Sequence, residues 1–153
     1  MLSDFQITVP EIGTFRAPEP PIVVLTSNRT REVHDALKRR CLYLWIDYPD
    51  FQKEHRIVTT RLPHVSDRLA EQVTAFVQEL RRTELYKVPG VSETLDWAAA
   101  LVALDREALD PALIDETLGV LLKYQEDVQA VRGARAGEVL ARALARGVRQ
   151  SGP

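Results

Sequence analysis

The chain has 153 residues, enough for one ordinary domain or for part of one domain with a second, smaller one. Its 20 basic and 22 acidic residues give a net charge of -2, which excludes a bulk electrostatic attraction to nucleic acid or to anionic lipid. The hydrophobic fraction of 45% and the charged fraction of 27% are typical of a soluble globular protein.

The single cysteine, Cys41, excludes an internal disulfide and a zinc cluster built from cysteines, and it fits a reducing compartment. The first residues, MLSDFQITVPE, lack the basic segment and the long apolar run of a signal peptide. No run approaches the roughly 18 apolar residues that a membrane-spanning helix needs. We therefore expect a cytoplasmic protein that makes no membrane contact.

The first predicted element is a β-hairpin. Phe5, Ile7 and Val9 alternate with polar residues, as in a half-buried strand. Residues 10–13 contain Pro and Gly, which favour a turn, and residues 14–16 are predicted to return as the second strand.

Two apolar runs, IVVL at 22–25 and LYLWI at 42–46, predict buried strands. Runs that are apolar on both faces are typical of a parallel sheet that helices cover on both sides. Between the runs, Val33 and Leu37 are spaced for one face of a short helix over residues 30–38. This strand–helix–strand order predicts a right-handed crossover.

After Pro49 the apolar residues recur with the period of a helix. Four polar residues precede the helical segments and are predicted to cap them: Asp50, Ser66, Ser92 and Asp110. The clearest amphipathic pattern follows the second of these caps, at Leu69, Val73, Phe76, Val77 and Leu80.

A further buried stripe is predicted after Asp110 and Pro111, a favourable helix start. It consists of Ile114, Leu118, Leu121 and Leu122. The predicted fold is thus an α/β fragment over residues 1–49, followed by an all-α bundle of four short helices over residues 50–131. Residues 132–153 are rich in Arg and Ala and are predicted to form a last helix or a tail.

Asn28 follows the apolar run PIVVLTS, and therefore lies at the carboxyl end of a predicted strand. Ligands of open α/β sheets bind at that edge. A neutral amide there can hydrogen-bond both a phosphate oxygen and a water molecule without titrating. The simpler interpretation is that Asn28 begins a turn and caps the helix that follows.

Arg39 and Arg40 follow the short predicted helix. Arginines at the end of a helix commonly complement its dipole. A guanidinium also matches the geometry of a phosphoryl group, on which it can stabilise negative charge during transfer. Both interpretations stay open on the residues alone.

Other features of the sequence do not point to chemistry. The run that ends in Asp47 imitates a Mg²⁺-binding strand, but Tyr48 follows it where a Glu would be expected. His34, His55 and His64 have no carboxylate at a ligand spacing, so no metal site is predicted. The phosphate-loop pattern G-x-x-x-x-G-K-[ST] does not occur in the 153 residues.

Several segments together resemble the second half of MoxR-type AAA+ ATPases. They are LSDFQITVPEIGTFRAPEPP, VVLTSNRTREVHDALKRRC, YLWIDYPD, PGVSETLDWA and LLKYQEDV. The resemblance runs from about Leu2 to Val131. It implies the last strands of an AAA+ core over residues 1–49 and a helical lid over residues 50–131, with the phosphate loop and the Walker B strand lying upstream.

The resemblance also implies roles for individual residues. Asn28 matches sensor 1, which positions water at the γ-phosphate, and Arg40 matches the arginine finger, with Arg39 as a possible accessory. Ser92 and Thr94 lie in the sensor-2 region, but Glu93 and Thr94 stand where an arginine is usual. Ser92 is therefore predicted chiefly as a helix cap.

The family implies ATP and Mg²⁺ as cofactors of the complete module, with neither expected to bind tightly to this chain alone. It further implies a homo-oligomer, usually a hexameric ring. The implied partners are von Willebrand factor A domain proteins and a metalloenzyme client that the ring helps to mature.

Two alternatives stay open. The first is a non-catalytic helical interaction domain derived from an AAA+ protein, and the second is a clamp-loader-like subunit, suggested by Arg40 and Cys41. A series of arginines near the carboxyl end could contact nucleic acid or an acidic partner, and the net charge disfavours nucleic acid. The series consists of Arg132, Arg135, Arg142, Arg146 and Arg149.

We also expect residues 1–49 to self-associate or to be poorly ordered in isolation, because an incomplete sheet exposes an edge.

Overall fold

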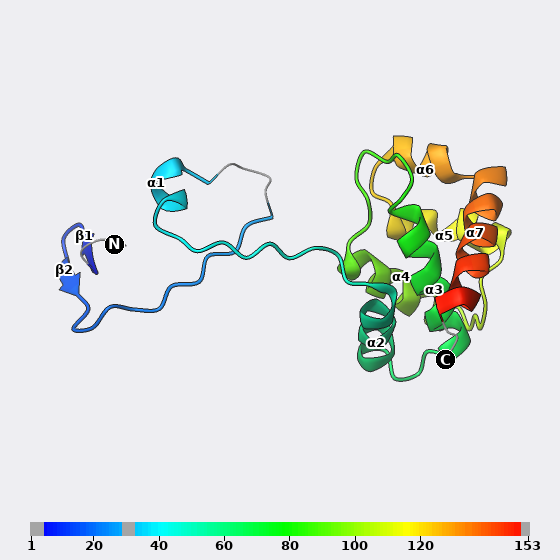
Figure 1. Cartoon of the computed structure of the whole chain (residues 1–153), viewed down its shortest axis with the longest axis horizontal. Coiled ribbons are helices and arrows are strands. Elements are labelled where there is room, and N and C mark those ends of the chain that lie inside the picture. Colours follow the sequence, from blue (N-terminus) through cyan, green and yellow to red (C-terminus); the bar gives the residue numbers. More distant parts are fainter. Residues whose placement is uncertain (1–4, 29–32, 151–153) are drawn as a thin grey trace. The chain divides into compact units, whose positions relative to one another are not determined.

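The computed structural model describes residues 5–28 and 33–150. The chain divides into two compact units, Met1–Ile46 and Asp47–Pro153. Within the described ranges the fold is mostly helical, with seven helices and one small antiparallel hairpin (Figure 1). No helix among these residues is both long enough and apolar enough to cross a membrane.

The predicted hairpin is confirmed in the first unit. Strand β1 spans Gln6–Val9 and pairs antiparallel with β2, Gly13–Arg16, so that Ile7 lies opposite Phe15. The turn uses left-handed backbone at Glu11 (φ 70°) and Gly13 (φ 109°), a conformation that glycine adopts without steric cost.

The predicted parallel sheet is wrong for the described residues, whose one sheet is this two-stranded hairpin. Residues 22–25 and 42–46 form no strand, and their side chains are largely exposed, with Ile22 at 97% and Leu42 at 103%. A buried parallel strand needs hydrogen-bonding neighbours at its edges and helices over both faces. The described residues of this unit supply neither, so neither run forms a strand.

The helix between these runs is shorter than predicted. Helix α1 spans Asp35–Lys38, and its cap is His34, whose Nδ1 accepts a hydrogen bond from the Ala36 N–H at 3.3 Å. The first part of the predicted range, at residues 30–32, lies outside the described residues.

The second unit is a helical bundle. Its helices are α2 (Phe51–Arg61), α3 (Asp67–Leu80), α4 (Val91–Ala103), α5 (Pro111–Leu121), α6 (Gln125–Val131) and α7 (Ala134–Gln150). Residues 50–131 contain five helices and not the four predicted, since α6 follows α5 closely. Of the two forms predicted after residue 131, a last helix or a tail, α7 is the helix.

Three of the four predicted caps are confirmed. Asp50 accepts from the Lys53 N–H at 2.8 Å, Ser66 from that of Leu69 at 3.2 Å, and Asp110 from that of Leu113 at 3.0 Å. These bonds satisfy backbone donors that the first turn of a helix leaves unpaired.

The prediction that Ser92 caps the next helix is wrong. The cap of α4 is Gly90, whose N–H donates to the Glu93 carboxylate at 3.0 Å. Ser92 is instead the second residue of the helix, and it is exposed. The carboxylate of Glu93 reaches back over the first turn and accepts from the N–H of the cap residue, which is the glutamate half of a capping box.

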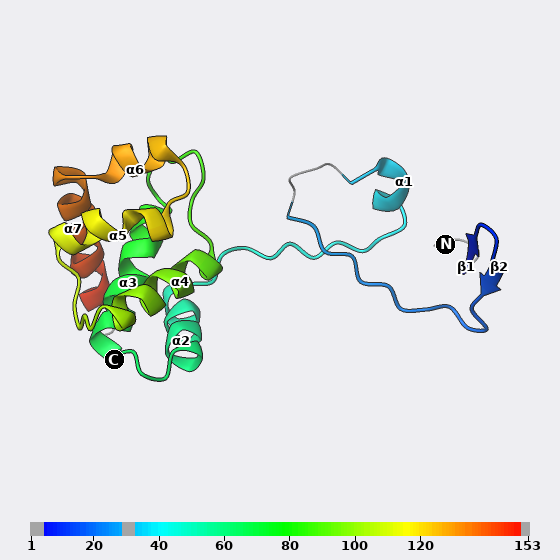
Figure 2. The ribbon, with the colours of Figure 1, turned by 180° about the vertical axis from the view of Figure 1, so that it is seen from behind.

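The core of the bundle surrounds α3, which packs against α2, α4 and α7 (Figure 2). All five apolar residues of its predicted stripe are buried: Leu69, Val73, Phe76, Val77 and Leu80. The rings of Phe76 and Trp97 lie 5.3 Å apart, and the Trp97 indole donates to the Thr117 hydroxyl at 2.8 Å. The buried stripe of α5, predicted at Ile114, Leu118, Leu121 and Leu122, is also confirmed.

Helix α7 adds a second apolar face to this core. Ala136, Val139, Leu140 and Ala143 are buried, whereas Leu144 is 38% exposed. The chain turns into α7 at Gly133 (φ 73°), whose N–H donates to the Asp115 carboxylate at 3.0 Å. Small residues let α7 approach α3 closely, and this packing brings the arginines of α7 beside the end of α3.

Candidate functional site

A buried ion pair connects α2 with the end of α3. The Glu54 side chain is 0% exposed, and it accepts two hydrogen bonds from the guanidinium of Arg81, at 2.6 and 2.7 Å. Gln78 donates to the same carboxylate at 2.6 Å, and the hydroxyl of Thr94 donates at 2.9 Å. Every oxygen of this buried charge is thereby bonded, as burial of a carboxylate requires.

The same network holds two loops against the helices. Gln78 donates to the carbonyl of Pro49 at 2.9 Å, and Nε of Arg81 donates to the carbonyl of Pro89 at 2.8 Å. The guanidinium of Arg81 also lies over the ring of Tyr48, 4.5 Å from its centre. The carboxylate of Glu54 and the guanidinium of Arg81 make their hydrogen bonds inside the bundle, so the role of this ion pair is to fix the segment that leads into α2.

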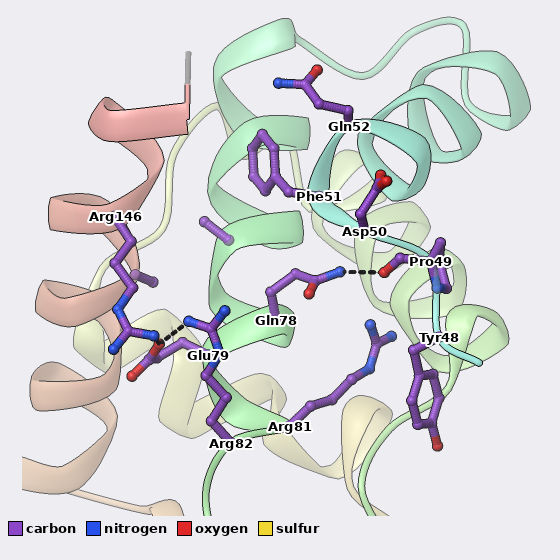
Figure 3. Close-up of a pocket in the computed structure, with 12 residues that line it drawn as sticks. Tyr48, Pro49, Asp50, Phe51, Gln52, Gln78, Glu79, Arg81, Arg82 and Arg146 are labelled. Carbon is purple, nitrogen blue, oxygen red and sulfur yellow. Dashed lines mark hydrogen bonds and ion pairs between the residues drawn. The ribbon is translucent and has the colours of Figure 1, made fainter. Parts of the chain in front are cut away.

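A pocket of about 690 Å³ lies beside this network. Its wall consists of residues 48–52, the last turns of α3 and the middle of α7 (Figure 3). Phe51, Ala75 and Ala143 give it an apolar side, and Arg82 and Arg146 give it a cationic side.

The cationic side is organised by one acid. Glu79 has a side chain that is only 7% exposed, and it lies between Arg82 and Arg146 (Figure 3). Its carboxylate contacts the guanidinium groups of Arg82 at 3.2 Å, Arg142 at 3.1 Å and Arg146 at 3.0 Å. The three arginine side chains are 51%, 42% and 52% exposed, respectively. Arg82 and Arg146 line the pocket, and Arg142 lies beside its wall.

Asn28, Arg39 and Arg40 lie in the first unit. Asn28 is exposed and lies three positions after the apolar run at 22–25 that was predicted as a strand. Arg39 ends α1, and its N–H donates to the carbonyl of Asp35 at 3.1 Å. Arg40 follows with an N–H bond to the Leu37 carbonyl at 2.9 Å, and both arginine side chains are exposed.

Ser92 and Thr94 lie in the second unit and have different surroundings. Thr94 is buried, and its hydroxyl contacts Glu54 and the carbonyl of Gly90, the latter at 3.0 Å. Ser92 is exposed at the start of α4. The structure thus separates the two residues of the predicted sensor-2 region into one internal and one surface position.

Among the described residues, no group of three or more His, Cys, Asp or Glu side chains is placed to hold a metal ion. Arg81, Glu54 and Glu79 were not singled out by the sequence. A signal was present for Glu54, because it falls on the buried face of α2 with Val58 at a spacing of four residues, where an apolar residue would be expected.

Comparisons of the chain with protein families, with curated proteins and with solved structures found no match.

Proposed function

We propose that this chain is the C-terminal part of a MoxR-like AAA+ ATPase module, with residues 50–131 as its helical lid. ATP and Mg²⁺ would be bound by the complete module, in which the phosphate loop and the Walker B strand come from outside these 153 residues. The chain alone would not hydrolyse ATP, because the sequence contains no phosphate loop to grip the β- and γ-phosphates.

One observation carries this proposal: the exposure of two apolar runs that flank Asn28 and the Arg39–Arg40 pair. In residues 22–25 and 42–46 the most exposed side chains include Val24 at 82% and Ile46 at 87%. Burying one such side chain contributes about 1.5–3 kcal/mol. Runs of this kind are retained where another part of a protein covers them, as the rest of an AAA+ core would.

The chemistry of the module would depend on two side chains of the first unit. The amide of Asn28 would position the attacking water near the γ-phosphate. The guanidinium of Arg40 would stabilise the charge that develops on the transferred phosphoryl group of a neighbouring subunit, with Arg39 as an accessory. We assign Thr94 to the internal bonding of the lid, and Ser92 stays the candidate for a lid contact with nucleotide.

An arginine finger acts on the next subunit, so the proposal includes a homo-oligomeric ring of the complete module. By the same resemblance, the ring would work with a von Willebrand factor A domain protein in the maturation of a metalloenzyme. These partners follow from the resemblance of the sequence segments and not from any contact in the structure.

The test joins this chain to the nucleotide-binding half of a MoxR-type ATPase and measures ATP turnover. We expect hydrolysis by the joined protein and background turnover by this chain alone. Arg40→Ala should reduce turnover by roughly a factor of a thousand, the effect typical of an arginine finger. Asn28→Ala should also abolish most of the activity.

The matched control is Arg16→Ala, which removes an exposed arginine from the hairpin of the same unit. Circular dichroism and nucleotide binding establish that each joined protein has folded. Equal turnover in the Arg40→Ala, Asn28→Ala and Arg16→Ala variants of a folded, ATP-binding protein would refute the assigned roles.

A second candidate function is a non-catalytic helical interaction module. It is favoured by the core of the second unit, because the buried apolar residues of the described part of the chain lie between Val58 and Ala143. This candidate predicts that partner capture by the full chain is unchanged by Arg40→Ala and by nucleotide. The ATPase proposal predicts that both changes alter assembly of the joined protein.

A further inference from the structure

A cluster of three arginines lies at one side of the pocket of the helical unit, where Arg82 and Arg146 line the pocket and Arg142 adjoins them through Glu79. Three guanidinium groups surround the single carboxylate of Glu79, which leaves a surplus of two positive charges, three minus one. A second acid, Glu138, lies 4.0 Å from Arg142 and 3.8 Å from Arg135, and the charges of Glu138 and Arg135 balance each other. The surplus of positive charge at Arg82, Arg142 and Arg146 is therefore not cancelled by Glu138.

The buried acid also fixes where these charges lie. A long arginine side chain normally loses rotamer freedom when it binds a ligand. Here Glu79 already holds three of them together, from the end of α3 and from two successive turns of α7. A guanidinium has five N–H donors, so each arginine keeps donors for a second acceptor. The arrangement is preorganised for an anionic group.

The remaining wall of the pocket has a different character. Phe51, Ala75 and Ala143 form an apolar side. Asp50 adds one negative charge to the lining, and its carboxylate caps α2 by accepting from the N–H of Lys53. The volume of about 690 Å³ is within the range of about 300–1,000 Å³ typical of ligand pockets. A carboxylate next to an apolar side chain would complement both sides of the pocket at once.

We propose that this pocket binds an acidic peptide segment of a partner protein. A carboxylate of the peptide contacts Arg82 and Arg146, with Arg142 adding positive charge beside them, and a neighbouring apolar side chain lies against Phe51 and the two alanines. The net charge of -2 disfavours nucleic acid as the occupant, and the apolar wall disfavours a bare inorganic anion. The residues involved are separate from Asn28, Arg39 and Arg40, so this proposal stands or falls independently of the ATPase proposal.

The experiment uses the full chain and a fluorescein-labelled peptide of alternating Glu and Leu, with binding followed by fluorescence anisotropy. A peptide of alternating Gln and Leu tests the need for carboxylates. We expect the acidic peptide to bind and the neutral peptide to bind at least about tenfold more weakly, as for loss of charge-assisted hydrogen bonds. NMR signals of the Nε–H groups of Arg82, Arg142 and Arg146 should shift during the titration.

Arg146→Gln should lower the affinity for the acidic peptide by about tenfold, because it removes one of the three donors. Arg68→Gln is the matched control, since it removes an exposed arginine from the start of α3, away from the pocket. Urea unfolding followed by circular dichroism establishes that both variants are folded. Arg82→Gln provides a second variant on a different helix end.

Four outcomes would overturn the proposal. They are no binding of the acidic peptide at millimolar concentration, equal affinity in the Arg146→Gln and Arg68→Gln variants, displacement of the peptide by inorganic phosphate at an equal concentration, and tighter binding of single-stranded oligothymidine than of the peptide. The last two would assign the same charges to a small anion or to nucleic acid instead.

Discussion

Similar apolar residues are exposed in the first unit and buried in the second. Ile22 and Leu42 in the first unit are 97% and 103% exposed, whereas Leu69 and Phe76 in α3 are both 0% exposed. Hydrophobicity alone therefore does not decide burial in this chain. The apolar residues of α3 recur with the period of a helix and share one face, which α2, α4 and α7 cover. The runs of the first unit are apolar on both faces and need cover from both sides.

The largest expected effect contrasts the two tryptophans of the chain. Trp97 is 0% exposed beside Phe76, and Trp45 is 64% exposed. Trp97→Ala should lower the free energy of unfolding by about 3–5 kcal/mol, because it leaves a cavity in the core. Trp45→Ala should change it by less than about 0.5 kcal/mol. Urea unfolding followed by circular dichroism measures both, and equal losses would contradict the contrast between the units.

The buried ion pair gives the next effect. Arg81→Met leaves the carboxylate of Glu54 buried without its guanidinium partner, and should destabilise the helical unit by about 3 kcal/mol or more. The matched control, Arg68→Met, replaces an exposed arginine of the same helix and should cost little. If the charge is the cause, adding Glu54→Leu to Arg81→Met should recover much of the loss. A double variant less stable than Arg81→Met would show that the unpaired charge of Glu54 does not cause the loss of stability.

A smaller effect separates two serines at helix starts. Ser66 caps α3 through the N–H of Leu69, but Ser92 follows the Gly90 cap of α4. Ser66→Ala should cost about 1 kcal/mol of unfolding free energy, and Ser92→Ala less than about 0.5 kcal/mol. Thermal unfolding of the two variants side by side provides the measurement, and the reverse order of stability would contradict the observed caps.

The smallest change in stability is expected from removal of residues 1–46. The helical unit contains its own core, so residues 47–153 should unfold cooperatively, within about 0.5 kcal/mol of the full chain. The same truncation should reduce self-association in sedimentation experiments, because it removes the exposed apolar runs. A truncated chain that unfolds without cooperativity would show that the helical unit depends on the first unit.

Much of the helical unit could be predicted from local spacing. The caps Asp50, Ser66 and Asp110 and the buried stripes of α3 and α5 depend on residues only a few positions apart. The cap of α4 was missed because it is Gly90, which has no side chain to cap the helix and whose N–H bonds to Glu93 three residues later. The parallel sheet was wrong because sheet formation depends on neighbouring strands that a pattern within one run does not reveal.

The amino-acid sequence by itself determined where most helices of residues 47–153 begin, which of their faces are apolar and which polar residues cap them. These properties depend on backbone donors and side chains within one or two turns. Only the tertiary structure decided that Glu54 pairs with Arg81, that Glu79 gathers arginines from α3 and α7, and that residues 22–25 and 42–46 stay exposed. Each of these depends on which distant segments pack together, and a local sequence pattern does not determine that packing.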